Sequence, residues 1–412
     1  MGNKERTHIW IFISIIIFVF FAQVCSKKAP AAQIEEQKKF EPTPENILEA
    51  IYSGRPVIEQ IGIQNSGATA KYKEKRNIPS GAVYEYEVTD SQWKEIALQL
   101  MNLETGQTLH IKVMKILDKL VYLGNDFQLE LEGRPAGELW NGYNTAYKVT
   151  EPPNWAVISN KYKRYDAQTD TVEEIIYSPY STTLHKSEFV KAGQEHLRED
   201  IREAIQRIHQ LKPSNVNLPL LVRGDDWIAG AMERVAMIEQ SDPYEVIEFD
   251  KGRLNFSPFG RVYVTIFLNQ GEAFGSTVSS ADANGLMQWT RRTWEEVIRK
   301  SYPWAMLDEF ETGSIDHIQS LTASILLYNY NLDFLNKTFG TDIFQWREPE
   351  HYLAACYNGS PATVVRAIRW ALGANAGPGR WRVRLRQLQK TSETYYFLEK
   401  LDVAIKHSYG SN

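Results

Sequence analysis

The chain has 412 residues, of which 43% are hydrophobic and 12% aromatic, and its formal net charge is −5. This composition provides cores for about two or three domains and excludes a chain that is disordered throughout. The mild negative charge argues against nucleic acid as the main partner, and we expect none.

The N-terminus carries a predicted targeting signal. Lys4 and Arg6 precede an apolar run over residues 9–22. The run is shorter than the roughly 20 residues of a membrane-spanning helix, which favours a signal peptide, with an uncleaved anchor as the alternative. We therefore expect residues 1–25 to be a signal peptide or membrane anchor. The body of the protein is then exported to the periplasm or cell envelope and held at a membrane by its N-terminus.

The chain has two cysteines, and we expect no disulfide. Cys25 occupies the place of the acylated cysteine in a bacterial lipoprotein signal, although the Ala-Gln-Val before it matches the usual small-residue box poorly. Lipidation of Cys25 and a cysteine without a role both stay open. Cys356 lies in an apolar helical stretch, where a free cysteine usually packs as a small buried hydrophobe.

The segment before residue 187 divides into a linker and a module. Residues 26–45 are rich in Lys, Ala, Gln, Glu and Pro, which is typical of a linker. Between residues 46 and 186, the segments 83–88, 108–123 and 126–132 have the alternating or aliphatic character of strands. We predict a small mixed α/β module here, of unknown function and without a chemical motif. Its Trp and Tyr side chains suit sugar rings, but core packing is their commoner use.

From Ser187 the apolar residues repeat with a helical period, and we expect a mainly α-helical domain over residues 187–412. Ser187 itself is the expected N-cap of the first helix. Further helix starts are expected at Asp242-Pro243, Asp316, Ser360-Pro361 and Ser392-Glu393. The fold class predicted for the whole chain is therefore α+β.

The C-terminal end is basic. From residue 361 onward there are nine Lys or Arg against three Asp or Glu. Within this stretch four arginines alternate with other residues, at Arg380, Arg382, Arg384 and Arg386. Such a patch could attract an anionic polymer, but a solvated helix face is the interpretation we favour.

Four short motifs follow one another in the helical half. They are Glu272-Ala273-Phe274, Gly285-Leu286-Met287-Gln288, the Leu-Ala-Ala-Cys-Tyr-Asn-Gly of residues 353–359 and the Glu-Thr-Tyr-Tyr-Phe of residues 393–397. In this order they resemble the catalytic domain of soluble lytic transglycosylases, which has a lysozyme-like fold related to goose-type lysozyme. The resemblance spans about residues 259–401 and does not extend to the N-terminal module.

The resemblance implies a peptidoglycan lytic transglycosylase that cleaves the β-1,4 bond between N-acetylmuramic acid and N-acetylglucosamine. Glu272 aligns with the single catalytic acid and base of that family, and no metal or other cofactor is implied. The substrate's acetamido group stabilises the cation, and its C6 hydroxyl closes onto C1 to give a 1,6-anhydro product. The aligned substrate-binding residues are Ser279, Met287, Gln288, Tyr357 and Asn358.

A carboxyl group donates a proton near neutral pH when burial beside apolar groups raises its pKa. Phe274, Met287 and Trp289 are the apolar candidates near Glu272, and we expect them to form a dry wall around it. The preceding residues 262–269 are expected to form a helix, although their β-branched composition also suits a strand.

The sequence departs from the family pattern at several positions. Ala273 replaces the serine after the glutamate, Arg291 the proline after the glutamine, and Phe397 the closing tyrosine that is thought to position the glutamate. The changes at Ala273 and Phe397 support an alternative in which the protein binds peptidoglycan without cleaving it.

Two further alternatives stay open. Asp282 stands where the family prefers glycine. If its carboxylate faced the cleft it would activate water and make the protein a hydrolytic muramidase, although a turn aspartate is the interpretation we favour. The helical domain could also open local gaps for a secretion or envelope machine, with residues 46–186 docking the partner.

Overall fold

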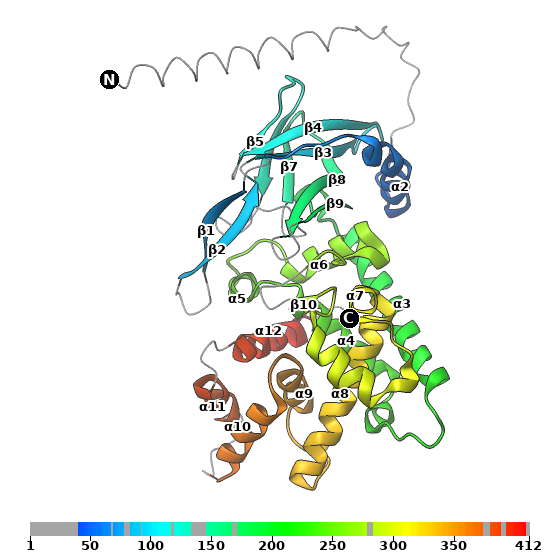
Figure 1. Ribbon diagram of the computed structural model, residues 1–412, viewed down its shortest axis with the longest axis vertical. Helices are drawn as coiled ribbons and strands as arrows, with labels where there is room; N and C mark the ends of the chain where they lie inside the picture. The colour runs from blue at the N-terminus through cyan, green and yellow to red at the C-terminus, as the bar shows by residue number, and fades with distance from the viewer. Residues whose placement is uncertain are drawn as a thin grey trace, which may run out of the picture. The chain divides into compact units, whose positions relative to one another are not determined.

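The computed structural model describes residues 40–66, 69–77, 83–91, 93–116, 119–132, 146–166, 171–277, 283–373, 380–388 and 393–408 (Figure 1). The chain divides into Met1–Phe40 and Glu41–Asn412, and nearly all described residues belong to the second unit. The predicted signal or anchor, with Cys25, lies outside the described residues, as does most of the predicted linker. None of the helices in the described part is long and apolar enough to cross a membrane.

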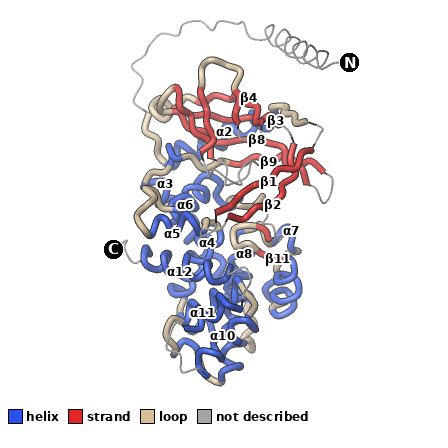
Figure 2. The backbone as a smooth tube through the Cα atoms, turned by 90° about the vertical axis from the view of Figure 1, so that its left-hand side faces the viewer, coloured by secondary structure: helices blue, strands red, loops and turns tan. Residues whose placement is uncertain are grey.

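The prediction of an α+β fold is confirmed, because antiparallel strands gather in one region of the described chain and helices in another (Figure 2). Five strands form the main sheet in the order β5-β4-β3-β8-β9, and β1 pairs with β2 and β6 with β7. The strands are β1 Thr69–Asn77, β2 Val83–Ser91, β3 Trp93–Asn102, β4 Thr108–Ile116, β5 Lys119–Val121, β6 Gln128–Glu132, β7 Ala146–Glu151, β8 Trp155–Asp166 and β9 Thr171–Tyr177. All three predicted strand segments fall on strands, and 108–123 is divided between β4 and β5.

The sheet has an aliphatic and aromatic core. Leu98 and Leu100 of β3 are fully buried. Trp155 at the start of β8 packs edge-on against Phe127, with 5.1 Å between the ring centroids. Tyr162, farther along β8, is buried as well. These aromatic residues of the N-terminal region therefore serve core packing.

Helix α2, Pro44–Gln60, is fixed to this sheet. Gln99 of β3 donates its Nε2 to the carbonyl oxygen of Ala50 at 2.7 Å. Gly54 approaches Gln99 so closely that a Cβ on it would lie 2.0 Å from that Nε2. Lys161 of β8 donates its Nζ to the carbonyl oxygen of Glu59 at 2.8 Å. The orientation of α2 is thus set by side chains from two neighbouring strands.

The region after β9 is helical. Its helices are α3 Ser187–Leu211, α4 Asp225–Glu239, α5 Pro243–Asp250, α6 Pro258–Asn269, α7 Phe310–Gly313, α8 His317–Phe339, α9 Pro349–Asn358, α10 Pro361–Gly373, α11 Arg380–Leu388 and α12 Glu393–Ser408. Short 3-10 turns are η1 Thr182–Leu184, η2 Pro219–Arg223, η3 Gln270–Glu272, η5 Pro303–Ala305 and η6 Ile343–Gln345, and η4 Thr293–Arg299 is a π-helix.

Two of the predicted helix starts are confirmed as N-caps. Asp242 accepts hydrogen bonds from two backbone amides of α5, and Asp316 accepts one from Gln319 at the start of α8. The expected N-cap at Ser187 is wrong by one residue. Lys186 occupies the cap, and the Ser187 hydroxyl donates to the Glu188 carboxylate instead.

Residues 262–269 are helical, as expected, and form most of α6. Their β-branched side chains are accommodated because the helix is surrounded by other elements. Val264 is fully buried, and the Phe267 ring stacks on Phe189 of α3 with 5.2 Å between centroids. Packing on several sides therefore outweighs the β propensity of this segment.

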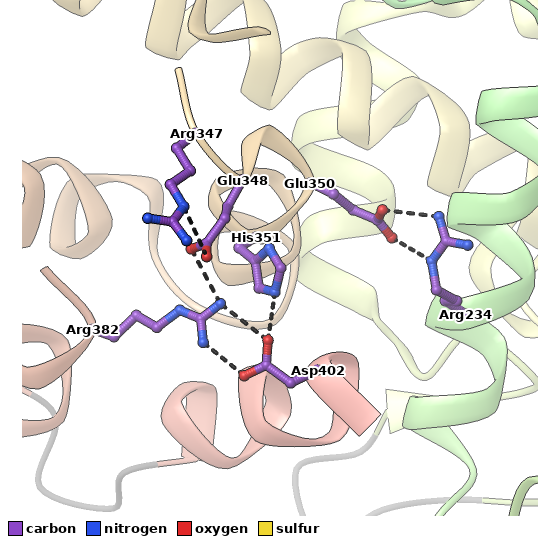
Figure 3. A network of polar contacts seen from close by, with 7 residues as sticks. All are labelled: Arg234, Arg347, Glu348, Glu350, His351, Arg382 and Asp402. Carbon is purple, nitrogen blue, oxygen red and sulfur yellow. Dashed lines mark hydrogen bonds and ion pairs between the residues drawn. The ribbon is translucent and has the colours of Figure 1, made fainter. Parts of the chain in front are cut away.

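Helix α9 is held at its first turns by a polar network (Figure 3). Arg234 of α4 binds the Glu350 carboxylate with two hydrogen bonds of 2.7 and 2.8 Å. His351 and Arg382 of α11 converge on Asp402 of α12, at 2.9 and 2.7 Å. Burial raises the pKa of Asp402, but the hydrogen bonds from His351 and Arg382 outweigh it and hold the pKa below its ordinary value. Three helices are thus tied to α9.

The alternating arginines of α11 are only partly solvated. Arg380 is exposed, whereas Arg382 belongs to the network on Asp402. The guanidinium of Arg384 lies 5.6 Å from the ring centroid of Trp370 on α10. The favoured interpretation as a solvated helix face therefore does not describe Arg382. Cys356, on α9, is free and buried as expected.

Candidate functional site

Glu272 lies on a strained turn. Helix α6 ends at Asn269, and η3 follows at once and ends on Glu272 itself. Gln270 has φ +51° and Phe274 has φ +62°, so one non-glycine residue on each side of Glu272 has a positive φ. Such backbone persists only where the surroundings hold it in place, and it is commoner at functional sites.

The backbone of this turn contacts a buried histidine. His317, the first residue of α8, contacts the carbonyl oxygen of Ala273 through Nε2 at 2.8 Å. Its Nδ1 contacts Asp200 of α3 at 2.9 Å. His317 and Asp200 are both buried. The residue after Glu272 is therefore connected to α8 through His317 and to α3 through Asp200.

The Gly-Leu-Met-Gln motif forms a tight turn. Residues 285–288 connect the short strands β10, Ala283–Asn284, and β11, Trp289–Thr290, which pair antiparallel. Gly285 has φ +75°, and a Cβ on it would lie 2.2 Å from the carbonyl oxygen of Ser314. The position therefore requires glycine for both conformation and space.

The four sequence motifs meet through a series of contacts. Gly285 donates its N–H to the carbonyl oxygen of Thr277, on the loop that follows Glu272, at 3.3 Å. The Tyr357 hydroxyl of α9 donates to the carbonyl oxygen of Met287 at 2.8 Å. Phe397 of α12 stacks on the Tyr357 ring, with 6.4 Å between centroids and 17° between planes. Segments far apart in the sequence therefore form one structural cluster.

Tyr357 is the centre of this cluster. Its hydroxyl also lies 3.3 Å from Ser324 Oγ of α8. Its ring contacts Trp289 and Tyr328, with centroids 6.1 and 5.8 Å away. Burial holds the pKa of the Tyr357 hydroxyl well above its usual range, so the group keeps its proton and acts as a hydrogen-bond donor.

The other predicted binding residues differ in their surroundings. Met287 is fully buried, so its side chain belongs to the core. Gln288 is half-buried and donates its Nε2 back to the carbonyl oxygen of Gly285 at 2.8 Å. Asn358 carries a buried Oδ1 with no hydrogen-bond partner within the described residues. Ser279 and Asp282 lie outside the described residues.

The expected dry environment of Glu272 is wrong for this structure. Its side chain is 66% exposed, and its Oε2 lies 2.9 Å from Arg55 Nη1 of α2. Phe274, Met287 and Trp289 are buried, so the expected apolar wall exists as core, but the carboxylate lies outside it. The reason is local: the η3 turn directs Ala273 and Phe274 inward and leaves Glu272 at the surface.

Residues of the N-terminal region that the sequence did not point to also surround this turn. Arg164 at the end of β8 donates its Nη1 to the carbonyl oxygen of Ser276 at 2.5 Å. Asn269, at the end of α6, exchanges two hydrogen bonds of 2.8 Å with the backbone of Ser178. Together with Arg55, these contacts place the sheet and α2 beside Glu272. No motif or spacing in the sequence connects them to it.

A second carboxyl group, that of Glu239, belongs to a segment that contacts the Gly-Leu-Met-Gln turn. Glu239 is the last residue of α4, and its neighbour Gln240 donates Nε2 to the carbonyl oxygens of Gly285 and Leu286 at 3.0 and 2.8 Å. Burial and the nearby Glu393 raise the pKa of Glu239 to about 8, although the ammonium of Lys400 opposes the shift. Among the described residues, no group of three or more His, Cys, Asp or Glu could hold a metal ion.

Comparison of this chain with protein-family models, with curated proteins and with solved structures found no match.

Proposed function

We propose that the protein is a peptidoglycan lytic transglycosylase with a lysozyme-like helical domain, and that Glu272 is its acid and base. The observation that carries the proposal is the 2.8 Å hydrogen bond between the Tyr357 hydroxyl and the Met287 carbonyl oxygen. It joins the two motifs that supply Gln288 and Asn358, and Gly285 of the first motif in turn contacts Thr277 on the loop after Glu272. Amide side chains of this kind suit the N-acetyl and hydroxyl groups of a glycan.

The proposed reaction uses one carboxyl group twice. Protonated Glu272 donates its proton to the bridging oxygen as the bond from C1 of N-acetylmuramic acid to that oxygen breaks. The substrate's acetamido oxygen stabilises the positive charge at C1. The Glu272 carboxylate then removes the proton of the C6 hydroxyl while the C6 oxygen bonds to C1. The products are a 1,6-anhydro sugar and a new free hydroxyl, without consumption of water.

This reaction sets a condition on the site. Glu272 must be protonated before it can act as an acid, whereas the ion pair with Arg55 at 2.9 Å requires a carboxylate. A bound glycan must therefore separate the two residues and exclude water from the turn. Exclusion of water favours the neutral carboxyl group, because desolvation penalises charge.

The ion pair also favours a second candidate function, a protein that binds peptidoglycan without cleaving it. A glutamate that is permanently exposed and bound to Arg55 would not transfer protons. Phe397 supports the same alternative, because it offers only a ring where the family has a hydroxyl.

Digestion of purified peptidoglycan sacculi tests both candidates. The full-length protein and its Glu272→Gln variant are incubated with sacculi, and the soluble products are analysed by mass spectrometry. Anhydromuropeptides released only by the wild-type protein support the transglycosylase. Products with reducing-end muramic acid would instead indicate a hydrolytic muramidase, and equal release by the two proteins would indicate a binding protein.

We further propose that the protein is exported and held at a membrane of the cell envelope, through a lipid on Cys25 or through an uncleaved N-terminal segment. Mass spectrometry of the mature N-terminus distinguishes an acylated Cys25 from an intact or a cleaved leader. Cross-linking and copurification with the full-length chain test whether envelope or secretion proteins bind residues 46–186.

A further inference from the structure

Arg55 is the only arginine or lysine of the described residues for which an ion pair with Glu272 is observed, and it comes from outside the helical region. Its Nη1 lies 2.9 Å from Glu272 Oε2, while its Nε lies 3.6 Å from Glu59 one turn farther along α2. The guanidinium is therefore close to two carboxylates, of which only Glu272 belongs to the candidate site.

The position of Arg55 follows from the sheet rather than from chance packing of a surface side chain. The neighbouring Gly54 is pressed against Gln99 of β3, and Gln99 also binds the carbonyl oxygen of Ala50 at 2.7 Å. Lys161 of β8 binds the end of α2 through Glu59 O at 2.8 Å. These contacts hold the backbone on both sides of Arg55, and its side chain faces the Glu272 turn.

The ion pair is suited to exchange. The Arg55 side chain is 37% exposed and the Glu272 side chain 66% exposed, so solvent and an incoming ligand reach both. Exposed ion pairs contribute little to stability because water screens them and both side chains lose freedom. A guanidinium binds carboxylates in a planar, two-point geometry, so another carboxylate can take the place of Glu272 without rearrangement of Arg55.

We propose that Arg55 is a substrate-binding residue that selects glycan strands carrying carboxylates, and that the substrate's carboxylate replaces Glu272 as its partner. The inference rests on the proposed function for the identity of the glycan. The carboxylate comes either from the stem peptide or from the lactyl group of a muramic acid that has lost its stem. Its binding separates Glu272 from the guanidinium of Arg55.

Binding measurements on inactive protein test this inference. Glu272→Gln removes the competing carboxylate and prevents turnover, and Arg55→Gln is added to it in a double variant. Isothermal titration uses three probes: stem-bearing glycan fragments, stem-free fragments with lactyl carboxylates, and neutral N-acetylglucosamine oligomers. We expect the double variant to bind at least one of the two anionic probes about ten-fold more weakly than the single variant, and the neutral probe equally well.

The choice between the two anionic probes identifies the carboxylate. Loss with stem-bearing fragments alone assigns the stem peptide, and loss with stem-free fragments assigns the lactyl group. A matched control adds Arg366→Gln, an exposed arginine of α10 whose observed side-chain partner is Thr363, and it should leave all three affinities unchanged. Arg55→Lys, which keeps the charge, should retain part of the preference.

Equal weakening of anionic and neutral probes, or no weakening, would overturn the role of Arg55. If Arg55→Gln lowers the melting temperature and so disturbs folding, the Glu272→Gln variant alone provides the test. Its affinity for the anionic probe must fall as ionic strength rises from about 50 mM to about 500 mM, while its affinity for the neutral probe stays constant. Product analysis of wild-type protein is separate, so a protein that selects carboxylates but makes no anhydro product would refute catalysis and not this inference.

Discussion

His317 connects Asp200 to the carbonyl oxygen of Ala273, directly after the candidate acid Glu272. One ring nitrogen faces the Asp200 carboxylate and the other faces a backbone carbonyl oxygen, so both lie within hydrogen-bond distance of a buried partner. The contact joins α3, α8 and the η3 turn through a buried polar group. Such a group is costly to remove, because its partners lose their hydrogen bonds without gaining water.

We predict that His317→Ala lowers the free energy of unfolding by about 2–4 kcal/mol. It should also lower the rate of sacculus digestion, because the turn that carries Glu272 loses its support. Urea unfolding and product release measure the two effects. Asp200→Asn provides the check, since residues in one network are coupled. Independent, additive effects of the two substitutions would contradict the proposed connection.

Glu272→Gln should affect activity far more than stability. Loss of the proton donor is expected to reduce product release by at least about 100-fold, the usual contribution of general acid catalysis. Because the side chain is 66% exposed, the free energy of unfolding should change by less than about 0.5 kcal/mol. Glu195→Gln, at an exposed position of α3 that pairs with Lys191, is the matched control and should be fully active.

Gly285→Ala is expected to be severely destabilising. Alanine at φ +75° is strained, and its Cβ would lie 2.2 Å from the Ser314 carbonyl oxygen, so backbone must move. We expect a loss of about 3 kcal/mol or more in the free energy of unfolding. Gly271→Ala is the control on the neighbouring turn, since a Cβ there meets nothing within 4 Å. Similar melting temperatures for the two variants would show that the Gly285 turn is less constrained than described.

Tyr357→Phe isolates a single hydroxyl. It keeps the ring contacts but removes the hydrogen bond to the Met287 carbonyl oxygen, and we expect a loss of about 1–2 kcal/mol together with slower product release. Tyr328 is the matched control, because its hydroxyl is buried without a hydrogen-bond partner among the described residues. Tyr328→Phe should therefore be neutral or stabilising. A larger loss at Tyr328 than at Tyr357 would refute the importance of the Met287 contact.

The sequence predicted the helices better than the environment of the candidate acid. Helical periodicity and capping residues such as Asp242 and Asp316 are local, so they can be recognised without a structure. The exposure of Glu272 depends instead on the direction of a turn between two strained residues. The burial of Phe274 and Met287 could be predicted from their apolar side chains. That the Glu272 carboxylate lies on the other side of the backbone could not be predicted.

Long-range partners were beyond sequence reasoning for a different reason. Arg55 lies on an amphipathic helix whose pattern predicts only that one face packs on something. Its contact with Glu272 depends on the sheet that carries α2 and on the position of that sheet beside α6. The buried His317 and the half-buried Gln240 are similar, because their roles are recognised only when their acceptor carbonyls are known.

The raised pKa of Glu239 predicts a dependence of stability on pH. Burial and Glu393 raise it from the ordinary value of 4.5 to about 8 in the folded protein. Between these two values the folded state retains a proton that the unfolded state has lost, so stability falls as pH rises. The cost is absent below pH 4.5, grows through the window and is complete above about 8. Each pKa unit is worth about 1.4 kcal/mol. Because Glu239 keeps part of its surface exposed, we expect a smaller total of about 1–3 kcal/mol.

Glu239→Gln separates this group from all other titrating residues. The amide is neutral at every pH, so the difference in free energy of unfolding between variant and wild type should grow in favour of the variant from about pH 5 to about pH 9. Urea unfolding at several pH values measures it. A difference that is constant with pH would mean that Glu239 titrates normally and that Lys400 holds it as a carboxylate. In that case Glu239 would be a carboxylate opposite the Lys400 ammonium. Glu239→Gln and Lys400→Met would then both be destabilising, because each leaves one buried charge without its counter-charge.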